Sequence, residues 1–388
     1  MTIGVPKEIK TGETRVAITP SLCARVTRSG ARVLVEKGAG LRAGFPDAAY
    51  RDAGAALAVS ADRLWRDADL VLKVKEPLPE EFARIQDGQT LFTYLHLAAA
   101  PALARELVRK NVLGIGYETV ESSDATLPLL KPMSQIAGRL ATQVGAHFLE
   151  SRHGGAGVLL GGVPGVSPAH VVVIGAGNSG AHAARLAVGM GARVTVLDLD
   201  SHKLDILDSE YHGRVALLQA SPGNIATACA DADLLIGAVL VPGARAPVVV
   251  SASMVRAMRA GSVIVDIAVD QGGCIETTRA TSHEQPTFVQ HGVVHYAVPN
   301  MPAMVGRTST LALTNATEPF VVALAQQGVS AALEQVRGLA AGVNTRAGRI
   351  VHRTVARALG EKAELVPPAA AVQGATATAS ASKRKSAR

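Results

Sequence analysis

The stretch AHVVVIGAGNSGAHAARLAVGMGARVTVLDLD, residues 169–200, decides the fold. An apolar strand leads into a glycine-rich turn, then an alanine-rich helix, then a second strand that ends at Asp198. The glycines follow the spacing Gly175-x-Gly177-x-x-Gly180. In dinucleotide-binding domains the first glycine makes a tight turn, the second admits a pyrophosphate and the third lets the helix pack on the strand. The order of these parts predicts a Rossmann-type unit with a dinucleotide site.

The acidic residue at the end of the second strand, Asp198, bears on whether the cofactor is NAD or NADP. A carboxylate at Asp198 accepts hydrogen bonds from the ribose hydroxyls of NAD and repels the 2′-phosphate of NADP. Asp200 shares the same strand face and is the alternative ribose ligand. The sequence therefore predicts NAD as the cofactor.

Outward from this stretch, short apolar runs alternate with amphipathic segments. The runs lack polar alternation, which is typical of strands buried on both faces of a parallel sheet. Strands are expected at 2–5, 32–36, 69–74, 89–95, 112–116, 170–175, 193–198, 214–218, 233–237, 262–267 and 293–297. Helices are expected at 20–29, 60–66, 101–110, 134–152 (capped by Ser134), 178–190, 251–259, 309–327 and 348–359.

Two sets of strands predict an α/β protein with two doubly wound, Rossmann-like parallel sheets separated by a cleft. The last helices are expected to return to the first domain. Residues 1–128 and 306–366 would form a substrate domain, 129–305 the NAD-binding domain, and 367–388 a disordered basic tail rich in alanine, serine and threonine.

Charge and composition argue against a nucleic-acid or membrane partner. The net charge is +7, but the tail cations Lys383, Arg384, Lys385 and Arg388 account for four of these charges. Aromatic residues make up only 3% of the chain, too few for a base-stacking surface. The apolar run 234–244 is too short to span a bilayer, and the first residues do not form a signal peptide. A tail that binds RNA or a membrane remains the less favoured alternative.

Cysteine and histidine spacing bears on compartment and metal. The cysteines Cys23, Cys229 and Cys274 are far apart and odd in number, which predicts free thiols in a reducing cytoplasm. The histidine and acidic residues do not form a convincing metal-ligand pattern, so no catalytic metal is expected.

Four ionisable residues stand where ligands bind in such folds, beyond the carboxyl ends of strands. Lys75, His96 and Asp270 each follow a predicted strand, and Arg15 lies in the loop after the first. Cations bind a carboxylate, and an imidazole moves protons near neutral pH. Together they predict a site for an amino or keto acid.

Each assignment has a competing interpretation. Lys73 and Glu76 flank Lys75, so that a solvated ion-paired turn is the alternative there. Asp266 competes with Asp270, although its position inside the strand run predicts burial. His182, on the helix after the glycine turn, is interpreted as structural.

The chain resembles the bacterial alanine dehydrogenase family over about residues 1–360. The resemblance rests on long motifs: GVPKEIKTGETRVAITP (4–20), VEKGAG (35–40), DLVLKVKEP (69–77), LFTYLHLAA (91–99), LLKPMSQIAGRLATQVGA (129–146), GGVPGV (161–166), VVVIGAGNSG (171–180), DLLIGAVLVPGARAP (233–247), VDIAVDQGGCIET (265–277) and NMPAMVGRTSTLALTNAT (300–317).

This resemblance implies a role for each matching residue. Arg15 and Lys75 would bind the substrate, and His96 and Asp270 would act as acid and base. The NAD site would comprise Ser134, Gly175, Gly177, Asn178, Gly180, Asp198, Lys203, Val239, Leu240, Ile267, Ala268, Val269, Asp270, Arg279, Val298, Asn300 and Met301. A serine usual in the family is replaced by Ala220 followed by Ser221, so that contact stays open.

The resemblance also implies an activity and an assembly: reversible, NAD-dependent oxidative deamination of L-alanine to pyruvate, ammonium and NADH by a homohexamer. The alternatives are a transhydrogenase-like NAD(H)-binding subunit, a saccharopine dehydrogenase-type enzyme acting on a larger amino acid, and a non-catalytic NAD-sensing or RNA-binding protein.

Overall fold

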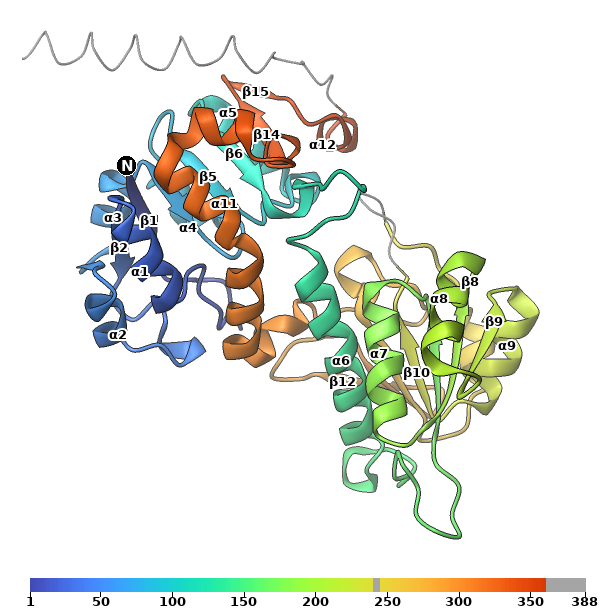
Figure 1. Ribbon diagram of the computed structural model, residues 1–388. Helices are drawn as coiled ribbons and strands as arrows, with labels where there is room; N and C mark the ends of the chain where they lie inside the picture. Colours follow the sequence, from blue (N-terminus) through green and yellow to red (C-terminus); the bar gives the residue numbers. More distant parts are fainter. Residues whose placement is uncertain (240–244, 361–388) are drawn as a thin grey trace, which may run out of the picture. The chain divides into compact units, whose positions relative to one another are not determined.

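A computed structural model describes residues 1–239 and 245–360. The described chain forms two compact units: unit 1 contains Met1–Pro132 and residues 303–360, and unit 2 contains Met133–Pro302. Each unit is built on one mainly parallel sheet with helices packed against it (Figure 1). The predicted α/β class with two doubly wound sheets is confirmed.

The sheet of unit 1 has eight strands in the order β15-β14-β6-β5-β4-β1-β2-β3. Strands β1 to β6 are parallel, and β14 and β15 add an antiparallel edge beside β6. The bounds are β1 (Thr2–Val5), β2 (Arg32–Glu36), β3 (Ala56–Ala58), β4 (Leu70–Leu72), β5 (Thr90–Thr93), β6 (Leu113–Gly116), β14 (Val343–Arg346) and β15 (Arg349–Ile350).

The sheet of unit 2 has seven strands in the order β12-β13-β11-β10-β7-β8-β9. Only the edge strand β12 is antiparallel. The bounds are β7 (His170–Ile174), β8 (Arg193–Asp198), β9 (Val215–Gln219), β10 (Leu234–Gly237), β11 (Val263–Asp266), β12 (Thr287–Gln290) and β13 (Val293–Tyr296).

The helices begin at polar caps or prolines that the sequence supplies. Thr19, Ser60, Ser221 and Ser251 each accept a backbone N–H in the first turn of the helix that follows. None of the helices in the described ranges has the length and apolarity needed to cross a membrane. The bounds are α1 (Pro20–Arg28), α2 (Asp47–Asp52), α3 (Ala61–Asp67), α4 (Pro79–Phe82), α5 (Pro101–Arg109), α6 (Lys131–Phe148), α7 (Asn178–Gly189), α8 (Ser201–Tyr211), α9 (Pro222–Asp231), α10 (Ala252–Arg256), α11 (Gly306–Gln335) and α12 (Arg353–Ala358).

Several expected elements differ from the structure. Helix α6 begins at Lys131, so Ser134 lies inside its first turn and is not the cap. The helix expected over 348–359 is wrong in its first half, because Arg349–Ile350 pair with β14 and only α12 is helical. Helix α11 runs on past 327 to Gln335, with a break where Gly328 takes φ 79°. The short strands β3, β12, β14 and β15 were not predicted.

Both faces of each sheet are covered, which explains the apolar strand sequences. In unit 2, Val172 and Ile174 pack with Ile225 of α9 and Val255 of α10. Val173, which points the other way, faces α7. In unit 1, Val71 and Leu91 pack with residues of α3, α5 and α12, including the fully buried Trp65. Buried strands of this kind leave only the strand ends for polar side chains.

Two glycines set the spacing of the helices over β7. A methyl group at Gly180 would overlap the carbonyl oxygen of Gly175, so α7 lies directly on the end of β7. A methyl group at Gly138 in α6 would overlap the carbonyl oxygen of Ser179 in α7. The absence of these side chains fixes α6 and α7 against the sheet.

Gly138→Ala is expected to destabilise unit 2 by about 1–3 kcal/mol, because the added methyl group must displace the backbone of α7. Urea unfolding followed by far-ultraviolet circular dichroism measures the loss. Trp65 is the single tryptophan of the chain and reports on unit 1, so its fluorescence transition should keep its midpoint.

Gly189→Ala is the matched control, because nothing lies within 4 Å of a methyl group at that end of α7. This variant should be neutral or more stable by up to about 1 kcal/mol. Equal stability of the two alanine variants would contradict the close approach of α6 and α7.

Candidate functional site

The candidate residues lie at the carboxyl edges of the two sheets. In unit 1, β1 and β4 are neighbours, and the chain continues from them toward opposite ends of the sheet. In unit 2, β7 and β10 have the same relation. Such reversal points are where open α/β sheets bind ligands.

The glycine turn joins β7 to α7 in the form that a dinucleotide requires. Gly175 adopts φ 101°, and a Cβ there would lie 2.6 Å from the carbonyl oxygen of Ala238. Gly177 caps α7, and a Cβ there would have no atom within 4 Å. Asn178 opens the helix with an exposed side chain. An anion can therefore approach the backbone amides at the positive end of α7.

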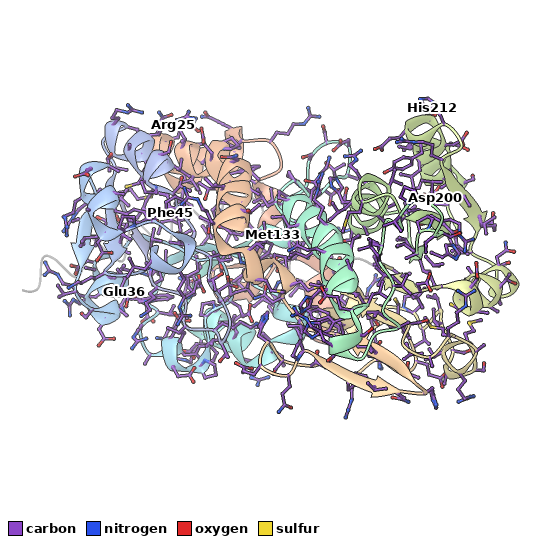
Figure 2. All side chains as sticks on the ribbon, turned by 90° about the horizontal axis from the view of Figure 1, so that it is seen from below. Arg25, Glu36, Phe45, Met133, Asp200 and His212 are labelled. Atoms are coloured by element: carbon purple, nitrogen blue, oxygen red, sulfur yellow. The ribbon has the colours of Figure 1, made fainter. Side chains whose placement is uncertain are left out.

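Asp198 and Asp200 have different partners. Asp198 ends β8 and accepts the backbone N–H of Ala176, in the glycine turn, at 2.6 Å. Asp200 accepts the N–H of His202 at 3.0 Å and caps the N-terminus of α8. Figure 2 labels Asp200 and His212, the residue that caps the other end of this helix. Lys203 lies 3.8 Å from Asp198 and 3.6 Å from Asp200. This geometry favours Asp198 as the ribose ligand.

Most of the other predicted cofactor residues of unit 2 follow strand ends as well. Ser221, left open in the sequence, caps α9 through the N–H of Asn224. Leu240 lies outside the described residues. Ser134 is in the first turn of α6, and the exposed Arg279 stacks on Phe288 at 4.3 Å. The remaining residues follow β10, β11 or β13: Val239, Ile267, Ala268, Val269, Asp270, Val298, Asn300 and Met301.

The competing acids Asp266 and Asp270 differ in solvent exposure. Asp266 is buried and accepts the N–H groups of Ala268 and Cys274, each at 3.0 Å. Burial raises the pKa of this carboxyl, although the hydrogen bonds oppose the shift. Asp270 is exposed and accepts the N–H of Asn300 at 3.2 Å, where Asn300 adopts φ 57°. Asp266 thus has a structural role, and Asp270 is accessible.

In unit 1, Arg15 is buried and held by Glu13, a residue that the sequence analysis missed. The Nε and Nη2 atoms of Arg15 donate to the two carboxylate oxygens of Glu13 at 2.7 and 2.5 Å. Burial opposes the charge, but these contacts outweigh it and raise the pKa of Arg15. The guanidinium is therefore fixed and charged next to the strand ends.

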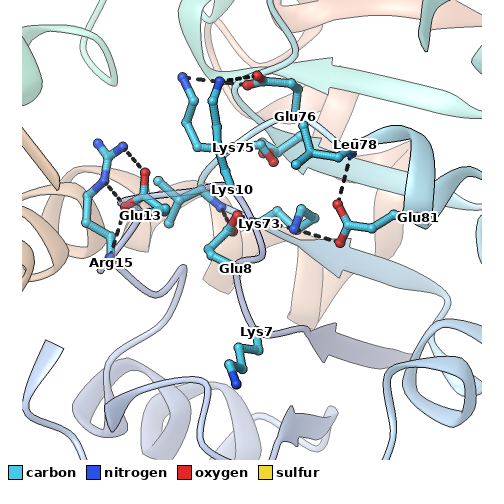
Figure 3. Close-up of polar contacts among 12 residues, drawn as sticks. Lys7, Glu8, Lys10, Glu13, Arg15, Lys73, Lys75, Glu76, Leu78 and Glu81 are labelled. Carbon is cyan, nitrogen blue, oxygen red and sulfur yellow. Dashed lines mark hydrogen bonds and ion pairs between the residues drawn. The ribbon is translucent and has the colours of Figure 1, made fainter. Parts of the chain in front are cut away.

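The two lysines after β4 have separate surroundings (Figure 3). Lys73 is buried between Glu8, at 3.2 Å, and Glu81, at 2.9 Å. Lys75 lies 3.6 Å from Glu76, which also binds Lys10 at 2.5 Å. Lys73 thus belongs to an internal charge cluster, while Lys75 is the lysine nearer the surface.

His96 follows β5 in a strained conformation that its neighbours hold. Its φ of 46° is left-handed. Glu118 accepts the backbone N–H of His96 at 2.7 Å and that of Leu95 at 3.2 Å. The ring of Tyr94 stacks on the imidazole with centroids 5.6 Å apart. Glu118 and Tyr94 are further residues that sequence spacing did not reveal.

The charge cluster predicts a pH effect on unit 1. Burial raises the pKa of Glu8, although Lys73 opposes the shift. The folded state therefore holds this proton more tightly than the unfolded state. Its contribution to stability is complete below a pH of about 4.3 and is lost as the pH rises through the folded pKa. As the pH rises above about 4.3, the free energy of unfolding of Glu8→Gln should therefore increase relative to that of the wild type, by up to about 1.4 kcal/mol per pH unit.

Urea unfolding followed by Trp65 fluorescence at several pH values measures this difference. Glu76→Gln is the control of opposite sign: burial opposes the shift, but Lys75 and Lys10 lower the pKa of Glu76. That variant should lose stability above a pH of about 4.3. Parallel pH profiles for Glu8→Gln and the wild type would contradict the raised pKa of Glu8.

Comparison with known proteins covers nearly the whole chain. Residues 4–137 match the alanine dehydrogenase/PNT N-terminal domain, and residues 141–353 match the C-terminal domain. The alanine dehydrogenase of Bacillus subtilis (strain 168) is 53% identical over 382 residues, covering 98% of this chain and 100% of the relative. That of Mycobacterium tuberculosis (strain ATCC 25618 / H37Rv) is 52% identical, covering 93% and 97%.

Solved structures agree with the sequence matches. An L-alanine dehydrogenase superposes with a TM-score of 0.90 at 54% identity, covering 93% of this chain and 99% of the other. A transhydrogenase from Sinorhizobium meliloti superposes with a TM-score of 0.76 at 23% identity, which shows a shared fold. The glycine turn, the strand-end residues and these matches over both units together show that the chain belongs to the alanine dehydrogenase/PNT family.

Proposed function

We propose that this chain catalyses the reversible, NAD-dependent oxidative deamination of L-alanine to pyruvate, ammonium and NADH. The observation that carries the proposal is the match to alanine dehydrogenases at 53% identity over essentially full length. The placement of Arg15, Lys75 and His96 at the carboxyl edge of one sheet supports it.

The substrate carboxylate is bound by the cations of unit 1. Arg15 supplies a guanidinium already oriented by Glu13, and Lys75 supplies an ammonium group near the surface. Because Arg15 does not need to be ordered when the substrate binds, little side-chain entropy is lost. Two fixed cations on one carboxylate would hold the substrate in a single orientation.

Proton transfer is assigned to His96 and Asp270. The ammonium group of the substrate must lose a proton before hydride leaves Cα. His96 accepts that proton. Water then adds to the resulting imine with help from His96 and Asp270, and ammonia leaves pyruvate. The contacts of Glu118 with the backbone of His96 hold the imidazole in place during these steps.

NAD fits the glycine turn of unit 2 and, when bound there, supplies the hydride acceptor. The space beside Gly177 would admit the pyrophosphate, and Asp198 would accept hydrogen bonds from the adenosine ribose. Ser134, Lys203, Arg279 and the residues after β10, β11 and β13 complete the proposed site. We further propose that the enzyme is a homohexamer, and that the buried free cysteines reflect a reducing cytoplasm.

His96→Ala is expected to lower kcat by about 10²- to 10⁴-fold, the usual contribution of a general acid or base. NADH absorbance with purified enzyme, NAD and L-alanine measures the rate. His283→Ala, at an exposed histidine of unit 2, is the control and should retain full activity. Wild-type turnover in His96→Ala would remove His96 from the mechanism, while wild-type protein inactive with alanine but active with another amino acid would change the substrate.

Asp198→Ala is expected to raise KM for NAD by about 10- to 100-fold, because a charged hydrogen bond to the ribose is lost. Its preference for NAD over NADP should fall as well. Steady-state kinetics with both cofactors provide the measurement. Asp200→Ser keeps a capping oxygen on α8 and removes the neighbouring charge, so it should retain most of the NAD preference. Loss of that preference in Asp200→Ser alone would transfer the ribose contact to Asp200.

A further inference from the structure

One group of side chains outside the proposed active site has the composition of a metal site. His147, Glu150 and His153 each offer a ligand atom, and these atoms lie within 4.8 Å of one another. None of the three belongs to the residues assigned to substrate or cofactor. We propose that they bind a divalent transition metal ion of the Zn²⁺ type.

The local fold brings the three residues together. On a continuous helix, neighbours three or four positions apart share a face, whereas residues six positions apart do not. Helix α6 ends at Phe148, and a 3-10 turn over Ser151–His153, called η4, follows it. This change of direction brings the rings of His147 and His153 to a centroid separation of 4.0 Å. A helix continuing to 152, as the sequence suggested, would have kept them apart.

The ligand set identifies the class of metal. Two imidazole nitrogens and one carboxylate suit Zn²⁺ and its neighbours in the transition series, whereas Mg²⁺ and Ca²⁺ prefer oxygen ligands. The carboxylate of Glu150 faces both rings, with Oε1 3.8 Å from His147 Nδ1 and Oε2 3.8 Å from His153 Nε2. Ligand atoms around tetrahedral zinc lie roughly 3.3–3.5 Å apart, so small side-chain rotations suffice to close the site.

Two further features favour a cation at this position. His147 lies in the last turn of α6, where the helix dipole presents its negative end. His147 and Glu150 also line a pocket with Val158, Leu160 and Met190, so water or another small ligand can reach that side. An open fourth position of this kind is usual where three protein groups bind zinc.

The side chain of Arg152 contacts two of the three proposed ligands, Glu150 and His153. Its Nε donates to His153 Nε2 at 3.0 Å and forms an ion pair with Glu150, 2.9 Å from Oε2. His153 must therefore accept through Nε2, with the lone pair that a metal would use. Because the side chain of Arg152 is 73% exposed, it can turn into solvent when the metal binds.

Titration calorimetry with ZnCl₂ on the full chain, stripped with a chelator beforehand, tests the proposal. His147→Ala and His153→Ala should each weaken binding by at least about 10-fold, since even the loss of an outer-shell partner costs that much. Arg152→Ala should tighten binding, because it removes both the competing donor and a repelling charge. His283→Ala, an exposed histidine elsewhere in unit 2, should leave the affinity unchanged.

Co²⁺ provides a second readout that is independent of enzyme activity. The wild type should gain the visible absorption of imidazole-bound cobalt, and both histidine variants should lose it. An unchanged Zn²⁺ affinity in His147→Ala and His153→Ala would overturn the site. An unchanged or weaker affinity in Arg152→Ala would overturn the displacement of the guanidinium.

Discussion

Coverage of both faces of each parallel sheet is the constraint on which the rest of the structure depends. Side chains alternate along β7, so Val173 meets α7 while Val172 and Ile174 meet α9 and α10. Polar groups therefore gather where the strands end, and the candidate residues of both units stand at these carboxyl edges. The missing side chain of Gly180 allows α7 to pack directly on β7. The N-terminus of α7 then faces the space beside Gly177.

The buried charges of unit 1 serve orientation more than stability. Taking Glu8, Lys73 and Glu81 out of water is costly, and apolar replacements for such groups are often just as stable. Their carboxylates also accept backbone N–H groups of Val74 and Leu78, so they fix the loop that follows β4. Glu13 does the same for the loop after β1 through Arg15. The result is a pair of loops with little freedom, which suits a site that must align a small substrate.

The parts that the sequence predicted well are those with a local signal. The strand, glycine turn and helix around Gly175 were placed nearly to the residue, and the burial of Asp266 followed from its position in a strand. The choice of Lys75 over Lys73 stayed open, because it depends on Glu8 and Glu81, which the fold supplies. Glu118 was missed for a similar reason: its carboxylate accepts the backbone N–H of His96, and the two residues meet only because β5 and β6 are neighbours in the sheet. Ser134 was misplaced because Lys131 and Pro132 begin the helix one turn earlier.

The discontinuous composition of unit 1 has a consequence for biosynthesis. Unit 2 is one uninterrupted segment, whereas β14 comes from the far end of the chain to pair with β6. Thr345 of β14 donates to Val112 and accepts from Gly114, so these groups stay unpaired until the ribosome has made residue 345. At about 5–20 residues per second, the edge of β6 is left open for many seconds after it emerges. During that time the nascent chain presents an unprotected strand to its neighbours, and chaperone demand should be concentrated there rather than in unit 2.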